Sequence, residues 1–136
     1  MITAVDSNVL IDILRVDASF GARSMSALRR CLNEGALVAC EVVWAETIAG
    51  AGPPSEVRRR LESSGIGFGA MTLESSERAG VEWSQYRRRG GPRTRLVADF
   101  LIGAHALNQA DRLLTRDRGF YRSYFPDLTI LDPTAN

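Results

Sequence analysis

Four acidic residues stand where a carboxylate can do chemistry. Asp6 and Asp117 each follow a short apolar segment of strand-like composition, whereas Glu46 and Asp99 each interrupt an apolar run of helical composition. A carboxylate inside an apolar helix must be paired, neutral or metal-bound, because an isolated buried charge is costly. If the four carboxylates converge, a hard divalent cation such as Mg²⁺ or Mn²⁺ relieves their mutual repulsion. We therefore expect a metal site built from these four residues.

Each acid also has an ordinary structural explanation. Asp6 and Asp117 precede predicted helices and suit the N-cap position, and Glu46 suits the solvent face of an amphipathic helix. Glu41 competes with Glu46 for a place in the site. A spacing of five residues puts these two about 140° apart around a helix. We assign Glu41 to the positive end of the helix dipole and Glu46 to the site.

The elements that must position these acids follow from the apolar pattern. Short apolar or β-branched runs predict strands at 2–5, 36–40, 112–115 and 128–131. Helical patterns occupy 9–14, 19–35, 42–49, 55–63, 75–89, 95–109 and 118–124, and the Gly-rich segment 66–73 fits either a strand or a loop. This alternation predicts an α/β fold with a mainly parallel sheet. The carboxyl ends of such strands, where ligands gather, carry Asp6 and Asp117.

Composition excludes several classes of protein. The chain has 136 residues, 17 basic against 16 acidic, and every basic residue is Arg. The absence of Lys excludes a Walker-type phosphate loop, a Schiff base and the receiver-domain form of phosphotransfer. The length predicts a single domain over 1–136. Two cysteines, no signal-peptide pattern and no membrane-length apolar run lead us to expect a cytoplasmic protein.

The order of the acidic motifs resembles that of the PIN-domain ribonucleases, and within them the VapC-type toxins of bacterial toxin–antitoxin pairs. The resemblance rests on the segments 5–10, 43–46, 98–106 and 113–120. It carries the family's acidic residues onto Asp6, Glu46, Asp99 and Asp117, and their polar neighbours onto Asn8 and Thr115. Many relatives have an Ile-Pro or similar pair before the third acid, where this chain has the segment 94–97. The local loop geometry there is therefore expected to differ.

This resemblance implies a fold, an activity and partners. The fold is a PIN-like three-layer α/β/α arrangement around a central sheet of four to five strands. The activity is metal-dependent endonucleolytic hydrolysis of RNA at a four-carboxylate Mg²⁺ or Mn²⁺ site, with Asn8 and Thr115 beside the substrate. The partners are RNA, a cognate antitoxin and a second copy of the chain in a homodimer, with no membrane.

Arginines cluster beside two of the acids. The run 87–95 contains five Arg and no acidic residue, and it precedes the Asp99 helix. We expect Arg88, Arg93 and Arg95 to contact RNA phosphates there, although a solvated helix end explains the same run. Arg116, beside Asp117, is expected to touch the substrate or a site-blocking residue of a partner.

Two other functions fit parts of the sequence. Asp6 after the first strand is also the position of a phosphorylated aspartate in phosphotransfer domains and phosphatases. A haloacid-dehalogenase-type phosphatase requires a second Asp two residues later, where this chain has Asn8. A catalytically inactive binding module of the PIN fold is the other alternative, and retention of all four acids disfavours it.

Overall fold

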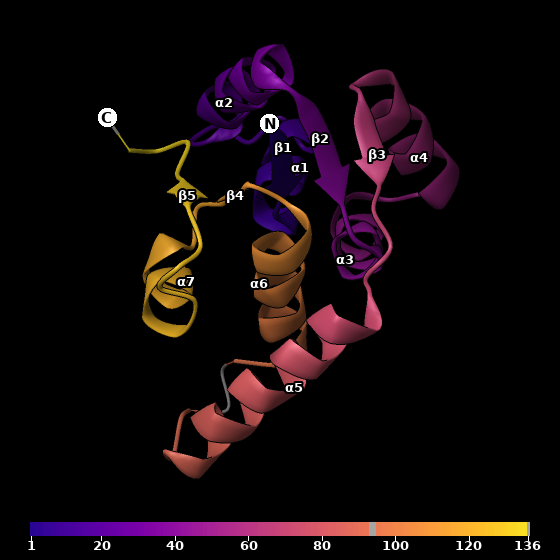
Figure 1. Ribbon diagram of the computed structural model, residues 1–136. Helices are drawn as coiled ribbons and strands as arrows, with labels where there is room; N and C mark the ends of the chain where they lie inside the picture. Colours follow the sequence, from indigo (N-terminus) through magenta and orange to yellow (C-terminus); the bar gives the residue numbers. More distant parts are fainter. Residues whose placement is uncertain (93–94, 136) are drawn as a thin grey trace.

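The computed structural model describes residues 1–92 and 95–135, and within them the strands form one five-stranded parallel sheet. Its order is β3-β2-β1-β4-β5, so the first strand lies at the centre (Figure 1). The strands are β1 (Ile2–Val5), β2 (Ala36–Ala39), β3 (Ile66–Phe68), β4 (Arg112–Leu114) and β5 (Ile130–Leu131). Ala4 of β1 pairs with Val38 on one side and Leu113 on the other. The predicted α/β fold with a parallel sheet of four to five strands is confirmed.

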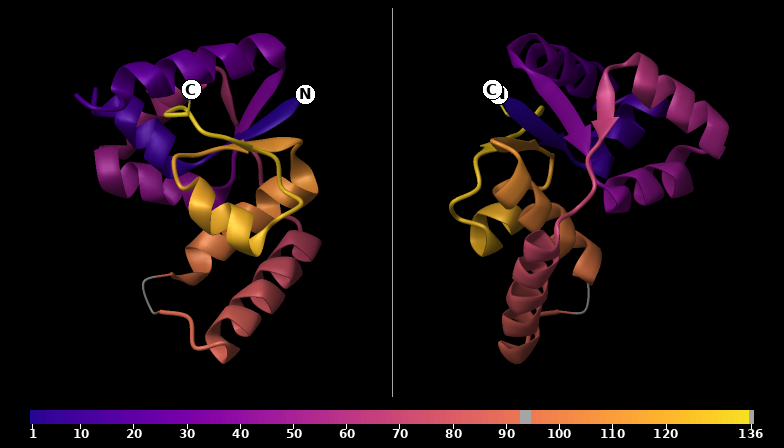
Figure 2. Two further views of the ribbon diagram at one scale, coloured as in Figure 1. Left: turned by 90° about the vertical axis from the view of Figure 1, so that its left-hand side faces the viewer. Right: turned by 45° about the vertical axis from the view of Figure 1, so that its right-hand side comes forward.

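Helices cover both faces of the sheet. From β1 the sheet extends through β2 to β3 on one side, and the chain then returns to place β4 and β5 on the other side of β1. Figure 2 shows α2 on one side of the strands and α6 with α7 on the other. The helices are α1 (Ser7–Leu14), α2 (Gly21–Glu34), α3 (Glu41–Ala51), α4 (Pro54–Ser63), α5 (Leu73–Arg88), α6 (Val97–Gln109) and α7 (Arg118–Tyr124). None of them has the length and apolar character needed to cross a membrane.

Helix starts determine how the acids are presented. Asp6 is the N-cap of α1, as its place after a strand predicted. Helix α6 begins at Val97, two residues later than the pattern from 95 onward suggested, because Leu96 has an extended backbone. Asp99 therefore lies in the first turn of α6, and its carboxylate accepts a hydrogen bond from the Leu96 N–H at 3.2 Å. A carboxylate in a first turn also complements the helix dipole.

An aromatic cluster joins the helices on the α6 face. The Phe100 ring lies at the centre, with the Tyr86 and Phe120 centroids 5.4 and 5.2 Å away. Tyr124 and Phe125 complete the cluster from α7 and its end. Such tilted and edge-to-face pairs add to the apolar area that these rings bury. They fix α7, which follows Asp117, against α6, which carries Asp99.

Candidate functional site

Asp6 is the buried centre of the site. Its side chain is at the end of β1, and the residue is only 5% exposed. One carboxylate oxygen, Oδ1, accepts the Ser7 N–H at 2.7 Å. The other, Oδ2, accepts the hydroxyls of Thr115 at 2.8 Å and Tyr121 at 3.1 Å. A carboxylate held by three strong donors is fixed in orientation before any ligand binds.

The same burial changes the acidity of Asp6. Burial disfavours the charged form and raises the pKa of Asp6 from 3.8 to about 6, and the nearby negative charge of Glu46 adds to the rise. Hydrogen bonds from Thr115, Ser7 and Tyr121 oppose it, because they stabilise the carboxylate. When Asp6 is ionised, its charge is therefore poorly solvated and lies near the carboxylate of Glu46.

Ser7 links Asp6 to Glu46. Helices α1 and α3 pack together, and the Ser7 hydroxyl donates to Glu46 Oε1 at 2.9 Å. Glu46 is partly exposed, so its carboxylate lies at the mouth of the site. Glu41 lies in the first turn of α3 and instead accepts the Met71 N–H at 3.0 Å. The two glutamates therefore serve different parts of the molecule.

Asp99 and Asp117 approach the site from the other side. Burial raises the pKa of Asp99, the Leu96 N–H and Arg95 lower it, and the charge of Asp117 raises it. Burial also raises the pKa of Tyr121 well above its usual value, and the charges of Asp6, Asp99 and Asp117 add to the effect. The Tyr121 hydroxyl thus contacts Asp6 and lies in the electrostatic field of Asp99 and Asp117, and Ser7 connects Glu46 to Asp6.

Arg95 neutralises one of these acids. Its guanidinium donates to both oxygens of Asp117, at 2.5 and 3.3 Å, and lies 4.5 Å from the centroid of the Phe120 ring. This bidentate pair raises the pKa of Arg95 further. Arg95, expected to contact RNA phosphate, is instead bound to a predicted site carboxylate. A phosphate at this position has to compete with Asp117 for the guanidinium.

The donors suit a hard divalent cation by their chemistry. Within residues 1–92 and 95–135, no three acidic, histidine or cysteine side chains are gathered closely enough to enclose a metal ion. The four predicted groups are nevertheless all carboxylates, the ligands that Mg²⁺ and Mn²⁺ prefer. Asp6 is also a buried carboxylate beside a second negative charge, a state that a cation stabilises. The residues present therefore fit such an ion.

The two polar neighbours of the acids support them. Thr115 is fully buried, and its hydroxyl accepts the Asp117 N–H at 3.0 Å while donating to Asp6. Asn8 donates its amide to Asp6 and Thr115, and its Oδ1 accepts the Arg116 N–H at 3.2 Å. We expected both residues to lie against the substrate. The bonds of Thr115 give it a positioning role, and the contact of both residues with the substrate stays a prediction.

The remaining predicted arginines lie elsewhere. Arg116 forms a bidentate pair with Asp12, at 2.7 and 3.1 Å, which gives it a structural role; its contact with the substrate or with a partner's site-blocking residue stays a prediction. Arg88 is exposed on the last turn of α5, beside Ser84 and Arg87, and not beside the acids. Arg93 lies outside the described residues.

Sequence reasoning missed three residues that organise the site. Ser7 bridges two acids, Tyr121 donates to Asp6, and Asp12 receives both Arg116 and the Ser24 hydroxyl. Tyr121 follows Asp117 by four residues, a spacing that puts both on one face of a helix. Asp12 interrupts the apolar run 9–14, the same signal that marks Glu46 and Asp99, whereas nothing local connects Ser7 with Glu46, which is 39 residues away.

The chain matches a known protein family over most of its length. The family model described as the PIN domain matches residues 3–126 of the chain. No curated protein matches it.

Several solved structures are similar over most of the chain. VapBC2 from Rickettsia felis, bound to a DNA fragment from their promoter, has a chain with a TM-score of 0.74 at 15% identity; 97% of this chain and 98% of that chain are covered. For VapBC-1 from nontypeable Haemophilus influenzae the TM-score is 0.73 at 19% identity, with 99% and 100% covered. Mycobacterium tuberculosis VapC20, a Sarcin-Ricin loop cleaving toxin, gives 0.58 at 13% identity, with 82% and 86% covered. At these identities the likeness establishes a shared fold.

Proposed function

Because this chain belongs to the PIN domain family, we propose that it is a metal-dependent endoribonuclease and the toxin of a type II toxin–antitoxin pair. The observation that carries the proposal is the hydrogen-bonded linkage of Asp6 to Glu46 through Ser7, and of Asp6 to the backbone of Asp117 through Thr115. Similar folds occur in toxin–antitoxin complexes and in a Sarcin-Ricin loop cleaving toxin. These likenesses support RNA as the substrate and an antitoxin as the partner.

The carboxylates of Asp6, Asp99 and Asp117, with Glu46 at the mouth, are the groups that would hold Mg²⁺ or Mn²⁺. Such an ion, when bound, activates water and stabilises charge on the phosphoryl oxygens. Ser7, Thr115 and Tyr121 orient Asp6 through hydrogen bonds. Arg95 balances the charge of Asp117, and its planar fork could bind a phosphate only by releasing that carboxylate.

Partners and assembly complete the proposal. The antitoxin covers the acidic site and suppresses cleavage, and the toxin forms a homodimer. The phosphotransfer alternative is disfavoured by the absence of Lys and by Asn8, which stands where a haloacid-dehalogenase-type phosphatase requires a second Asp. An inactive binding module is the alternative that a cleavage assay addresses.

Cleavage of RNA with and without EDTA tests the proposal. We expect Mg²⁺ or Mn²⁺ to support cleavage, EDTA to abolish it, and Asp6→Asn and Asp99→Asn each to lower the rate by about 100-fold or more, because supporting residues alone cost 10–100-fold at metal sites. The measurement is the rate of product formation on denaturing gels with total RNA.

Asp127→Asn is the matched control for this assay. Asp127 is exposed, and it makes no side-chain hydrogen bond or ion pair with the described residues. The Asp127→Asn variant should cleave RNA at the rate of the unchanged chain. Cleavage that persists in EDTA, or unchanged rates in Asp6→Asn and Asp99→Asn, would show that the acids do not form a metal site for RNA hydrolysis.

A further inference from the structure

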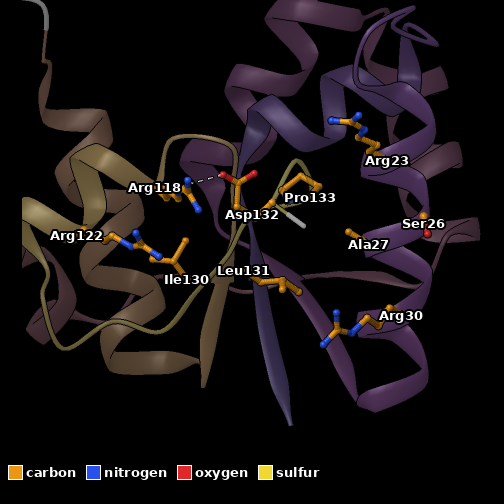
Figure 3. A pocket seen from close by; sticks show the side chains of 11 residues that line it. Arg23, Ser26, Ala27, Arg30, Arg118, Arg122, Ile130, Leu131, Asp132 and Pro133 are labelled. Carbon is orange, nitrogen blue, oxygen red and sulfur yellow. Dashed lines mark ion pairs between the residues drawn. The ribbon is translucent and has the colours of Figure 1, made fainter.

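A second basic region lies away from the acids, in a cavity between α2, α7 and β5. Its volume is about 380 Å³. Figure 3 shows Arg118 and Arg122 of α7 on one side and Arg23 and Arg30 of α2 on the other, with β5 between them. We name this the arginine cavity. Its volume is within the range of pockets that bind small ligands, about 300–1,000 Å³.

The positive charge of the arginine cavity is only partly compensated. Asp132 is its one acidic lining residue among those described. Its Oδ2 lies 3.6 Å from Arg118 Nε, which is longer than a hydrogen bond. Its Oδ1 is engaged by the N–H and hydroxyl of Thr134, at 2.8 and 2.6 Å. Asp132 thus neutralises at most one of the four arginines.

The other three arginines differ in their partners. Arg30 pairs with Glu34 at 3.0 Å on the exposed surface of α2, and such surface pairs are weak. Arg23 and Arg122 form no ion pair or side-chain hydrogen bond with any described residue. Packing of the fold does not require either guanidinium, so both are available to an anionic ligand.

The lining also contains an apolar floor. Ala27 of α2, Ile130 and Leu131 of β5, and Pro133 lie between the arginines. Arginine rims bind phosphate bidentately, and an apolar surface accepts the face of a base or ribose. The combination matches one nucleotide unit with its phosphate better than a free inorganic anion, which has no apolar part.

The position of the cavity connects it with the proposed site. Arg118 directly follows Asp117, and β5 is hydrogen-bonded beside β4, whose end carries Thr115. A strand of nucleic acid that leaves the acids along α7 reaches the arginine cavity next. We propose that this cavity binds a nucleotide of the RNA substrate beyond the cleaved bond, holding its phosphate with Arg23 and Arg122. This inference rests on the proposed function, which supplies RNA as the ligand.

Binding of single-stranded RNA in EDTA tests the assignment without cleavage. The probe is a fluorescently labelled oligoribonucleotide, and the measurement is anisotropy over a range of salt concentrations. The double variant Arg23→Gln/Arg122→Gln should bind about 10-fold more weakly at low salt. Its salt slope should fall by about 0.7, because the one phosphate that the two arginines hold contributes about 0.7 in a single strand.

The double variant Arg15→Gln/Arg29→Gln is the matched control. It removes the same charge from two exposed arginines that do not line the cavity, and its affinity should change by less than about 2-fold, since neither side chain would contact the bound phosphate. Thermal unfolding of both variants checks that each folds. Equal affinity of the two double variants for RNA overturns the assignment. So does a selective loss of affinity for the antitoxin, which would assign the cavity to a protein partner.

The outcomes separate this inference from the proposed function. If the unchanged chain fails to cleave RNA with Mg²⁺ or Mn²⁺ but Arg23→Gln/Arg122→Gln still weakens RNA binding selectively, the ribonuclease proposal fails and the cavity assignment stands. If cleavage is metal-dependent but the two double variants bind RNA equally, the cavity assignment fails alone.

Discussion

At the scale of single residues, the site is defined by how one carboxylate is held. Asp6 is a predicted N-cap and it occupies that position, yet the N-cap explanation does not account for its other partners. The hydroxyls of Thr115 and Tyr121 both donate to Oδ2. An N-cap needs only a backbone N–H of its own helix. Donors from β4 and α7 show that the fold arranges several elements around this one side chain.

The raised pKa of Asp6 predicts a pH-dependent stability in metal-free buffer. The folded-state pKa is about 6 and the ordinary value is 3.8, so the folded chain binds this proton more tightly. Stability from this group is present at low pH and is lost as the pH rises between the two values. The loss is about 3 kcal/mol at most. Asp6→Asn lacks this titration, so its free energy of unfolding should change less between acidic and neutral pH.

Urea unfolding with EDTA, below and above this pH window, measures the effect. Asp127→Asn should follow the unchanged chain, because Asp127 is exposed and lies outside the site. The comparison uses the difference between variant and parent at each pH, which removes the contributions of other groups. Parallel stability curves for the parent and Asp6→Asn would contradict a buried, proton-retaining Asp6.

At the scale of elements, ion pairs between distant segments hold the strand ends. Arg116, just after β4, reaches Asp12 of α1, and its guanidinium also lies 4.1 Å from the Phe20 ring centroid. Asp12 is only 5% exposed. A buried carboxylate without its partner is strongly destabilising. The pair therefore ties α1, which Asp6 caps, to the end of β4, which supplies Thr115.

Replacement of a helical glycine by Ala should have opposite effects on stability at two positions, Gly103 and Gly80. A Cβ on Gly103 of α6 would lie 2.6 Å from Phe125 Cδ2, whereas a Cβ on Gly80 of α5 meets nothing within 4 Å. Gly103→Ala should lower the free energy of unfolding by about 1–3 kcal/mol through overpacking. Gly80→Ala should raise it by up to about 1 kcal/mol, because Ala favours helix over Gly.

Chemical denaturation of the two alanine variants measures these changes. Each is the control for the other, since both replace a glycine in the middle of a helix. Equal effects at the two positions would contradict the close packing of α6 on the segment that follows α7. That packing is what places Asp99 beside Asp117, so loss at Gly103 should also lower RNA cleavage.

At the scale of the whole molecule, metal binding should couple to unfolding. Ions that bind only the folded chain raise its stability by RT ln(1 + [L]/Kd), which is about 2.7 kcal/mol at 100 times Kd. Mn²⁺ or Mg²⁺ should therefore raise the midpoint of thermal unfolding of the parent, and EDTA should reverse it. Asp6→Asn and Asp99→Asn should lose most of this increase, and Asp127→Asn should keep it. An equal increase in all four proteins would show that the ions bind elsewhere.

Acidic and basic side chains also occupy separate regions of the molecule. The near balance of 17 basic and 16 acidic residues hides separate regions, because acids gather at the ends of β1 and β4 while arginines line the cavity beside β5. Arg95 and Arg116 are paired with Asp117 and Asp12, so they contribute less to the attraction of RNA than their number suggests. The arginine cavity supplies positive charge that the fold does not use.

The sequence by itself determined the elements and the acids. Local apolar periodicity and N-cap chemistry act over a few residues, so the alternation of strands and helices and the place of Asp6 at a strand end were readable from neighbouring residues. The parallel direction of the strands then follows from their alternation with helices, whereas the strand order came only from the structure. The segment 66–73 was ambiguous because only pairing with β2 selects a strand there, and that partner is distant in the chain.

Only the tertiary structure decided what the polar side chains contact. Arg95 and Arg116 both suit phosphate by their chemistry, and their partners, Asp117 and Asp12, are 22 and 104 residues away. The Thr115 hydroxyl was expected beside a ligand and is buried against Asp6, which is 109 residues away. A side chain's residue type sets which bonds it can form, but the packing of distant elements selects the partner, because hydrogen bonds and ion pairs act over only a few ångströms.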